Sequence, residues 1–299
     1  MISIIVPTYN YVCTKLVTDL SEQAQNLKNK LHDDFDYEIL VADDGSDNIQ
    51  TIKENRKINH IKNCRLLEYQ SNIGRALIRN WLIEQSHFKY LLIIDSDALV
   101  CTNDFIEKYW NNRHQADFIC GTIQNPNIPC PSGYELRYYY EQHAEKTRKK
   151  KGDNTNPYFR LSTFNLFFNK EKLGILRFDP RCKEYGYEDA LMGLTLKERG
   201  LSLIHINNPL IHNGIDSNAS FLSKTEAAMR TLSNLDGLMK DNAGTSVMYH
   251  KLKKMHILSI FRLFFLCFQK LIRANLLGHH PSLFLFQLYK LGYYSQINQ

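Results

Sequence analysis

Short apolar runs rich in β-branched residues recur along the chain, and segments of helical length separate them. We predict strands at residues 2–6, 37–43, 64–69, 91–95 and 201–206. Helices are expected up to about residue 31, at 48–60, at 75–86 and up to residue 199. Strands that alternate with helices predict an α/β fold, in which a mostly parallel sheet is covered by helices on both faces.

The middle of the chain has a different composition. Residues 123–135 contain three prolines, and residues 145–157 are charged and then turn-forming. So polar a stretch buries too little apolar surface to stay ordered alone, and we therefore predict a mobile loop at 145–157. Its basic run at 148–151 is expected to be solvated. Binding of a phosphate or a lipid headgroup is the alternative.

The cysteines and the first residues indicate a cellular compartment. The seven cysteines are scattered, odd in number and never spaced as Cys-x-x-Cys. This usage is untypical of a disulfide framework or a thiolate zinc site, and it indicates a reducing compartment. The opening MISIIVPTYN lacks the basic region and long apolar core of a signal peptide. We therefore expect a cytoplasmic protein.

Polar clusters follow the predicted strands. There are four of them: Pro7-Thr8-Tyr9-Asn10, Asp43-Asp44-Gly45-Ser46, Asn72-Ile73-Gly74-Arg75 and Asp95-Ser96-Asp97. In open parallel sheets, ligands bind at the carboxyl ends of strands, near the point where the strand order reverses. A single Asp-Gly-Ser is more often a turn. Four clusters at strand ends predict a shared ligand site.

Two acids end the strand at 91–95, where an unpaired buried carboxylate is costly. Alternate residues of an extended segment point to the same side, so Asp95 and Asp97 can face one hard cation. Mg²⁺ or Mn²⁺ prefers oxygen ligands and shares its shell with substrate phosphates. An acidic turn is the alternative. A phosphatase of the haloacid dehalogenase type is disfavoured, because Leu99 stands where that class has Thr or Val.

Several segments, in their order along the chain, carry a resemblance. They are VPTYN, VADDGSD, SNIGRALIRN, IIDSDA, FDPRCKEYGYEDALMGLTLKERG and LIHN. Together they resemble family 2 glycosyltransferases of the GT-A fold, over roughly residues 1–215. The segment with Tyr-Gly-Tyr-Glu-Asp is similar to that of bacterial transferases that synthesise capsules and glycans. The resemblance implies a Rossmann-like catalytic domain, which we assign to residues 1–240.

The resemblance also implies roles in binding a nucleotide-sugar, expected to be a UDP-sugar. Residues expected to hold the donor are Pro7, Thr8, Tyr9, Asp44, Asn72, Gly74, Arg75, Arg79, Asp95 and Ser96. The implied metal ligands are Asp97, His212 and Asp95, with Mn²⁺ or Mg²⁺ as the cofactor. For Arg75 and Arg79, which are four apart on one helix face, a plain surface pair is the alternative. His205 is expected to be structural.

Glu188 and Asp189 open a predicted helix, where the helix dipole favours acids. That explanation would suffice for one acid. Sugar transfer also needs a base for the proton of the acceptor hydroxyl, and the resemblance implies Asp189 in this role, with Glu188 orienting the acceptor. Tyr185 and Tyr187 are expected to stack on the acceptor, a glycan or lipid-linked sugar. We expect an inverting transferase. A sugar-nucleotide-binding protein without turnover and a nucleotidylyltransferase are the alternatives.

The last part of the chain, residues 241–299, is basic. No Asp or Glu follows Asp241, whereas seven Lys and Arg do, so the formal net charge of +6 leaves about −1 for the rest. Residues 251–276 have a helical pattern with a polar stripe, and such a helix can lie on an anionic membrane surface. Packing on the catalytic domain or in a homo-oligomer is the alternative. A spanning helix and nucleic-acid binding are disfavoured.

Overall fold

A computed structural model describes residues 1–151, 157–182 and 184–298. Two compact units are formed from segments that alternate along the chain. The sheet unit comprises the segments 1–126, 151–180 and 192–214, and the helical unit comprises 127–150, 181–191 and 215–299. Each unit is described by itself. The domain boundary at residue 240 stays a prediction.

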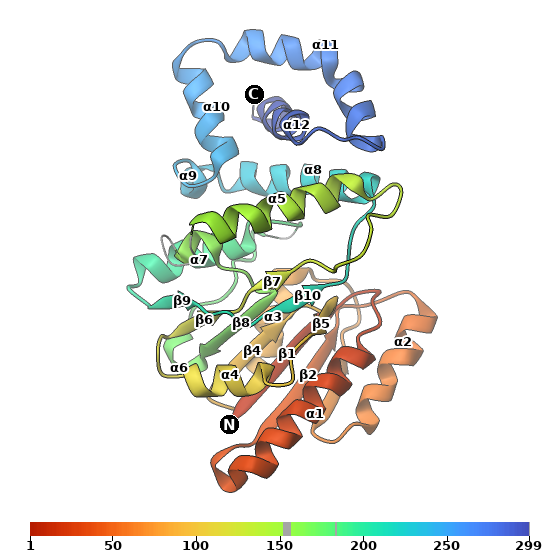
Figure 1. The fold of residues 1–299 in the computed structure, drawn as a ribbon. Helices are drawn as coiled ribbons and strands as arrows, with labels where there is room; N and C mark the ends of the chain where they lie inside the picture. Colours follow the sequence, from red (N-terminus) through yellow and green to blue (C-terminus); the bar gives the residue numbers. More distant parts are fainter. Residues whose placement is uncertain (152–156, 183, 299) are drawn as a thin grey trace. The chain divides into compact units, whose positions relative to one another are not determined.

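The sheet unit is built on a seven-stranded sheet with the order β3-β2-β1-β4-β8-β6-β9 (Figure 1). Its strands are β1 (Ile2–Thr8), β2 (Tyr37–Asp43), β3 (Cys64–Glu68), β4 (Tyr90–Ile94), β6 (Phe118–Cys120), β8 (Asn165–Asn169) and β9 (Leu203–His205). The first four strands are mutually parallel, β8 runs antiparallel to both β4 and β6, and β9 is parallel to β6. The predicted α/β fold with a mostly parallel sheet is confirmed.

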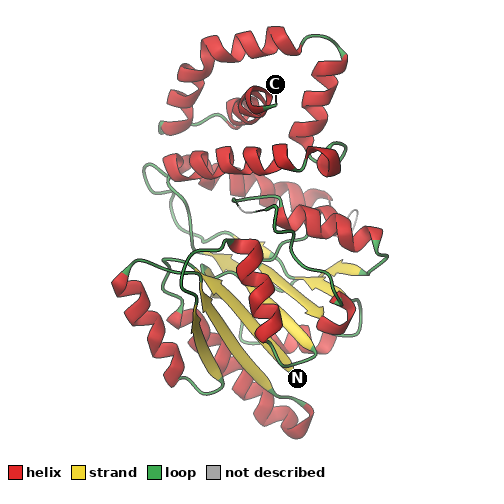
Figure 2. Ribbon diagram, turned by 180° about the vertical axis from the view of Figure 1, so that it is seen from behind, coloured by secondary structure: helices red, strands yellow, loops and turns green. Residues whose placement is uncertain are grey.

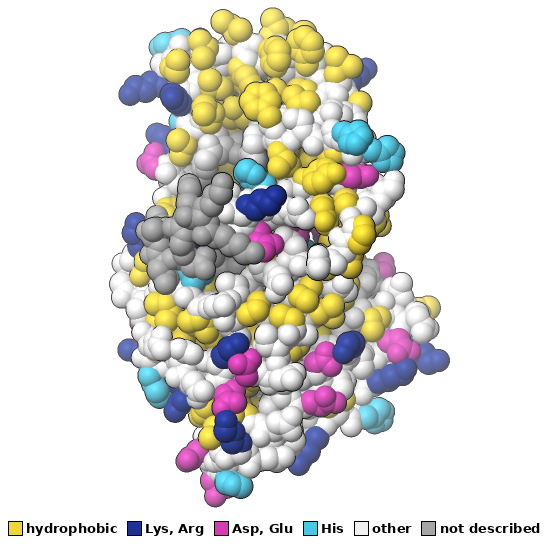
Figure 3. Space-filling view, viewed as in Figure 1, with side chains coloured by type: hydrophobic (Ala, Val, Ile, Leu, Met, Phe, Trp, Pro, Cys, Tyr) yellow, Lys and Arg dark blue, Asp and Glu magenta, His cyan; other side chains and the backbone are white. Residues whose placement is uncertain are grey.

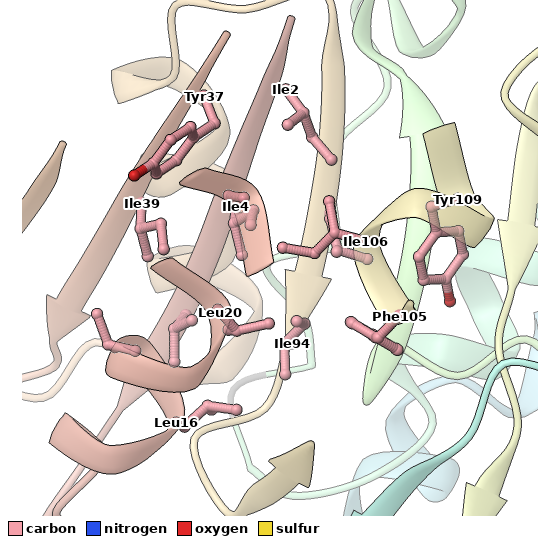
Figure 4. Close-up of a cluster of buried hydrophobic side chains, with 14 of the residues drawn as sticks. Ile2, Ile4, Leu16, Leu20, Tyr37, Ile39, Ile94, Phe105, Ile106 and Tyr109 are labelled. Atoms are coloured by element: carbon pink, nitrogen blue, oxygen red, sulfur yellow. The ribbon is translucent and has the colours of Figure 1, made fainter. Parts of the chain in front are cut away.

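Helices cover the sheet because each has an apolar side. Figure 4 shows residues of α1 (Thr14–Leu31) and α4 (Phe105–Asn112) packed with Ile4, Ile39 and Ile94 of the strands. Ile5, on the alternate side of β1, is equally buried, and α3 (Arg75–Gln85) contacts β1 and β2. Helix α2 (Ile49–Arg56), the 3₁₀ turns at 32–34, 57–60 and 157–160, and α6 (Lys170–Leu173) complete the connections.

A second, three-stranded sheet lies in the same unit. It consists of β5 (Ala98–Val100), β10 (Leu210–His212) and β7 (Ile123–Gln124), with β10 in the centre. β10 runs antiparallel to β5, and His212 is the register partner of Ala98. These strands of two or three residues were not predicted. They matter because they bring residues after position 210 next to the Asp95–Asp97 turn.

The helical unit contains only helices among its described elements (Figure 2). They are α5 (Glu135–Lys151), α8 (Asn218–Asn234), α9 (Asp236–Met239), α10 (Gly244–Lys254), α11 (Leu258–Leu277) and α12 (Leu283–Ile297), and α7 (Glu188–Glu198) begins here. Helix α12 contacts α8, α10 and α11. Leu136, Phe221, Phe265 and Phe286 belong to the core between these helices.

Two predictions about these helices are wrong. The expected mobile loop at 145–157 is helical up to Lys151, because Leu136 and Tyr140 anchor α5 in the core of the helical unit. The side chains at 148–151 and residues 152–156 lie outside the described part of the chain. The single helix expected at 251–276 is broken at 255–257, between α10 and α11. Among the described residues, none of the helices combines the length and apolarity that a membrane span requires.

Candidate functional site

The loops after β1 and β2 are joined by the side chain of Asn10. Its Oδ1 accepts hydrogen bonds from the backbone N–H groups of Asp47 (3.2 Å) and Asn48 (3.1 Å). The backbone N–H of Asn10 donates to Ser46 Oγ (2.7 Å). Thr8 is buried and donates to the carbonyl of Tyr11. Pro7 is half-buried, whereas Tyr9 is 48% exposed. The predicted donor-binding residues at the end of β1 therefore lie beside a loop that hydrogen bonds connect to the loop after β2.

Asp44 holds the start of α3. Its carboxylate accepts from the backbone N–H groups of Ile73 (2.8 Å) and Gly74 (3.0 Å). Burial raises the pKa of Asp44, although these two hydrogen bonds act in the opposite direction. Gly45 has a φ of +70°, and a Cβ there would come within 2.6 Å of the backbone N of Asn72. The second and third polar clusters are therefore in contact, and Asn72 is exposed at their surface.

Asp95 is paired with two arginines of α3. Arg79 is buried and donates from Nη2 to Asp95 Oδ1 at 2.8 Å, and Arg75 Nη1 lies 4.0 Å from Asp95 Oδ2. Burial would raise the pKa of Asp95, but the charges of Arg79 and Arg75 outweigh it and lower that pKa. Arg79 is thus an interior residue rather than a surface one. Arg75 and Ser96 remain at least partly exposed beside it.

Asp97 and His212 form a pair. Asp97 Oδ2 lies 3.2 Å from His212 Nε2, because the antiparallel register of β5 and β10 puts His212 opposite Ala98. The N–H of Asn213 also donates to the Asp97 carbonyl. Gly214 makes room for the carboxylate, since a Cβ at that position would lie 2.3 Å from Asp97 Oδ2. A carboxylate and an imidazole this close can bind one divalent cation.

The two candidate metal ligands, Asp97 and His212, suit a cation that is also coordinated by its substrate. Among the described residues, no group of three His, Cys, Asp or Glu side chains is placed to hold a metal. Mg²⁺ and Mn²⁺ sites that bind nucleotides use one or two protein ligands and complete the shell with phosphates and water. Asp97 and His212 supply that number. Asp95, the third predicted ligand, accepts a hydrogen bond from Arg79 through Oδ1, and its role as a ligand stays a prediction.

Sequence reasoning missed three residues beside this pair. They are Tyr11, Asn213 and Gly214. Burial raises the pKa of the Tyr11 hydroxyl, which hydrogen-bonds the side chain of Asn213 and lies near Asp97. Tyr11 directly follows the first polar cluster, so its position in the chain was a usable signal. Gly214 gave no signal, because its importance depends on a contact with Asp97 across the fold.

The predicted base segment belongs to the helical unit, and its backbone conformation is unusual. Gly186 and Tyr187 both have positive φ, +99° and +67°. A Cβ at Gly186 would lie 2.7 Å from Ala228 Cβ of α8, so this turn is pressed against that helix. Such conformations cost free energy and cluster at functional sites. The turn places the buried Glu188 and the half-exposed Asp189 in the first turn of α7.

Tyr185 and Tyr187 differ in their surroundings. Lys224 Nζ lies 5.7 Å from the centre of the Tyr185 ring, and the Tyr185 carbonyl accepts from Thr231 of α8. Tyr187 is largely enclosed, and burial raises the pKa of its hydroxyl to about 12 despite a hydrogen bond with Thr245. Tyr185 is the better placed of the two for contact with a ligand. Lys183, in the same segment, lies outside the described residues.

The predicted site residues thus fall into two groups. Thr8, Asp44, Arg79, Asp95, Asp97 and His212, with their neighbours, are assembled in the sheet unit. Tyr185, Tyr187, Glu188 and Asp189 are assembled in the helical unit. His205, predicted to be structural, has its Nε2 3.1 Å from the carbonyl of Pro157.

The sequence and the fold are similar to those of known proteins. Residues 3–173 match the family model described as glycosyl transferase family 2. A protein of Haemophilus influenzae, described as an uncharacterized glycosyltransferase, is 31% identical over 114 residues, which are 37% of this chain and 41% of the relative. The aligned part is therefore less than half of that relative's length.

Two solved structures show the same fold. TarS of S. aureus, residues 1–349 in complex with UDP-GlcNAc, has a TM-score of 0.52 and 16% identity, covering 99% of this chain and 90% of that one. Glucosyl-3-phosphoglycerate synthase from Mycobacterium tuberculosis, in complex with Mn²⁺, UDP and glucosyl-3-phosphoglycerate, has a TM-score of 0.51 and 17% identity, covering 78% and 79%. At such identities the likeness shows the fold alone.

Proposed function

Because the chain belongs to glycosyltransferase family 2, we propose that it transfers a sugar from a nucleotide-sugar donor to an acceptor hydroxyl with the aid of a divalent cation. The observation that carries this proposal is the Asp97–His212 pair beside the carboxyl ends of the parallel strands. A UDP-sugar is the proposed donor, since the TarS and synthase structures are complexes with UDP-GlcNAc and UDP.

Each part of the sheet unit has a proposed task. The loops after β1 and β2, together with Asp44, border the nucleoside, and Arg75 provides a cationic contact for a phosphate. Asp97 and His212 would hold Mn²⁺ or Mg²⁺, and the cation would supply positive charge for the departing diphosphate. Asp95, hydrogen-bonded to Arg79, would lie near the ribose.

The residues proposed to bind and activate the acceptor belong to the helical unit. We assign Asp189 as the general base that takes the proton of the attacking hydroxyl, and Glu188 as the residue that orients the acceptor. Tyr185 contributes an aromatic face for a sugar ring, and Tyr187 is proposed to contact the acceptor as well. Attack from the side opposite the diphosphate inverts the anomeric centre. The proposed acceptor is a glycan or a lipid-linked sugar, with the protein on the inner face of the cell membrane.

The proposal is tested by release of nucleotide from a panel of nucleotide sugars, with Mn²⁺, with Mg²⁺ and with a chelator. We expect release with the metal ions only. In Asp97→Ala, turnover should fall by about 100-fold or more, because the cation stabilises the leaving group. Asp33→Ala, at an exposed position of the same unit, is the matched control. Metal-assisted nucleotide binding without release of nucleotide would instead support the non-catalytic alternative.

A further inference from the structure

Helix α11 is apolar on the side that faces away from the helical core. Leu258, Phe265, Ile272 and Leu276 are buried against α8 and α12. On the opposite side, large apolar side chains are exposed: Ile260 (70%), Leu263 (64%), Leu271 (68%), Phe264 and Phe268. Positions 260, 263, 264, 268 and 271 follow helical spacing and form one stripe, here called the outer face. Figure 3 shows hydrophobic side chains gathered over α10 to α12.

The arginines of α11 form hydrogen bonds and an ion pair with neighbouring helices of the unit. Arg262 donates to the carbonyls of Ser295 (2.8 Å) and Asn298 (2.6 Å) at the end of α12. Arg273 pairs with Glu226 of α8 at 2.8 Å. Two positions of the polar stripe, Arg262 and Arg273, therefore join α11 to its neighbours. A helix that is apolar on both sides is expected to be covered on both, and a contiguous exposed patch of this kind marks an interaction site.

The charge around the outer face identifies the partner. Lys251, Lys253 and Lys254 end α10 just before the outer face begins, and all three are exposed, as is Lys270 beside it. Residues 242–299 contain no Asp or Glu. The same segment of a second copy would offer these lysines no opposite charge, because it contains no acid either. An anionic lipid surface is complementary both to the lysines and to the apolar stripe.

We infer that the outer face of α11 inserts into the interfacial region of an anionic bilayer, with the α10 lysines on the headgroups. This inference rests on the membrane-side location included in the proposed function and deepens it by naming the contact face. The inference about α11 is tested by lipid binding alone. A protein without sugar transfer could still bind lipid, and a protein that does not bind lipid could still transfer sugar, so the two proposals can fail separately.

The test is co-sedimentation of the full chain with vesicles of phosphatidylcholine, with and without phosphatidylglycerol. We expect binding to the anionic vesicles and little to the neutral ones. The double variant Ile260→Asn/Leu271→Asn should weaken binding by about 100-fold, because each side chain loses an apolar burial that is worth about tenfold or more. The triple variant Lys251→Gln/Lys253→Gln/Lys254→Gln should weaken it by about fivefold per lysine. High salt should affect the wild type more than this triple variant.

The matched control is Ile49→Asn/Ile175→Asn, because these isoleucines are 82% and 85% exposed in the sheet unit. It should bind vesicles like the wild type. Two outcomes overturn the inference: equal loss of binding in both double variants, or no vesicle binding at all by the wild type. If light scattering shows a dimer that Ile260→Asn/Leu271→Asn dissociates, and vesicles are not bound, the outer face is an interface between copies of the chain.

Discussion

The absence of a Cβ at Gly214 leaves the space that the Asp97 carboxylate occupies beside His212. Any Cβ there would enter the space of the Asp97 carboxylate, at 2.3 Å from Oδ2 and 2.8 Å from Cβ. The carboxylate can reach His212 only because this space is left open. Gly214 therefore positions a ligand without being one.

We predict that Gly214→Ala displaces the Asp97 side chain and weakens Mn²⁺-assisted nucleotide binding by tenfold to 100-fold, since misplacement by about 1 Å has such effects. Calorimetric titration of UDP with and without Mn²⁺ measures it. Gly237→Ala is the matched control, because a Cβ at that glycine meets open space. An unchanged difference between the two titrations would show that the pair is not the metal site.

One substitution distinguishes a catalytic role of Asp189 from a purely structural role at the start of α7. Asp189→Asn keeps its size but cannot accept a proton, so turnover should fall by about 10²- to 10⁴-fold while nucleotide affinity stays constant. A structural role predicts only a small loss of stability, since the dipole interaction is worth about 0.3–1 kcal/mol. Initial rates and melting temperatures distinguish the two. If Asp189→Asn has a near-normal turnover rate and Glu188→Gln loses most of its turnover, the base is Glu188.

At the scale of elements, α3 is fastened to β4 through one buried ion pair. Arg79→Met would leave Asp95 without its closest partner, and removing one member of a buried pair costs about 3 kcal/mol or more. Arg75→Met, one turn earlier and 46% exposed, should cost less than about 1 kcal/mol. Urea unfolding of both variants measures the difference. Equal losses would mean that burial of the pair has no importance for stability.

The start of α5 predicts a response to acid. Hydrogen bonds from its own backbone N–H, and then from His279, Gly133 and Asn218, outweigh desolvation and lower the pKa of Glu135 to about 2. A carboxyl with a lowered pKa stabilises the fold above its unfolded pKa of about 4.5, and this contribution is lost as the pH falls toward 2. Between these values, the free energy of unfolding should therefore fall more steeply for the wild type than for Glu135→Gln. Parallel pH profiles would contradict this assignment.

The elements differ in how far the sequence predicts them. The four parallel strands β1 to β4 are continuous apolar runs, and the composition and length of these runs were sufficient to predict them. β5, β7 and β10 have two or three residues, too few for a periodic signal, and their register decides that Asp97 meets His212. The resemblance alone pointed to that pair. Helix α5 was missed because its stability comes from burial of Leu136 and Tyr140 by distant helices, which a local charge count does not include.

At the scale of the whole molecule, residues 1–240 are proposed as the catalytic domain, and this boundary is testable. Helix α8 contacts α11 and α12, and its Phe221 and Leu222 are buried in the same core as Phe286. We expect the chain truncated after residue 240 to melt at a lower temperature than the full chain and to bind a dye specific for apolar surface. An unchanged melting temperature would establish 241–299 as an independent appendage.

The alternation of the two units along the chain has a consequence for how the protein is made. The Tyr140 and Phe286 rings lie 5.6 Å apart, although one leaves the ribosome roughly 150 residues after the other. At about 5–20 residues per second, helix α12, which packs against α5, is synthesised roughly 7 to 30 s after α5. The sheet unit also needs residues up to 214 for its last strand. Neither unit is therefore expected to finish folding until its distant segments have been synthesised. In the meantime the apolar surfaces of the earlier segments can be recognised by chaperones.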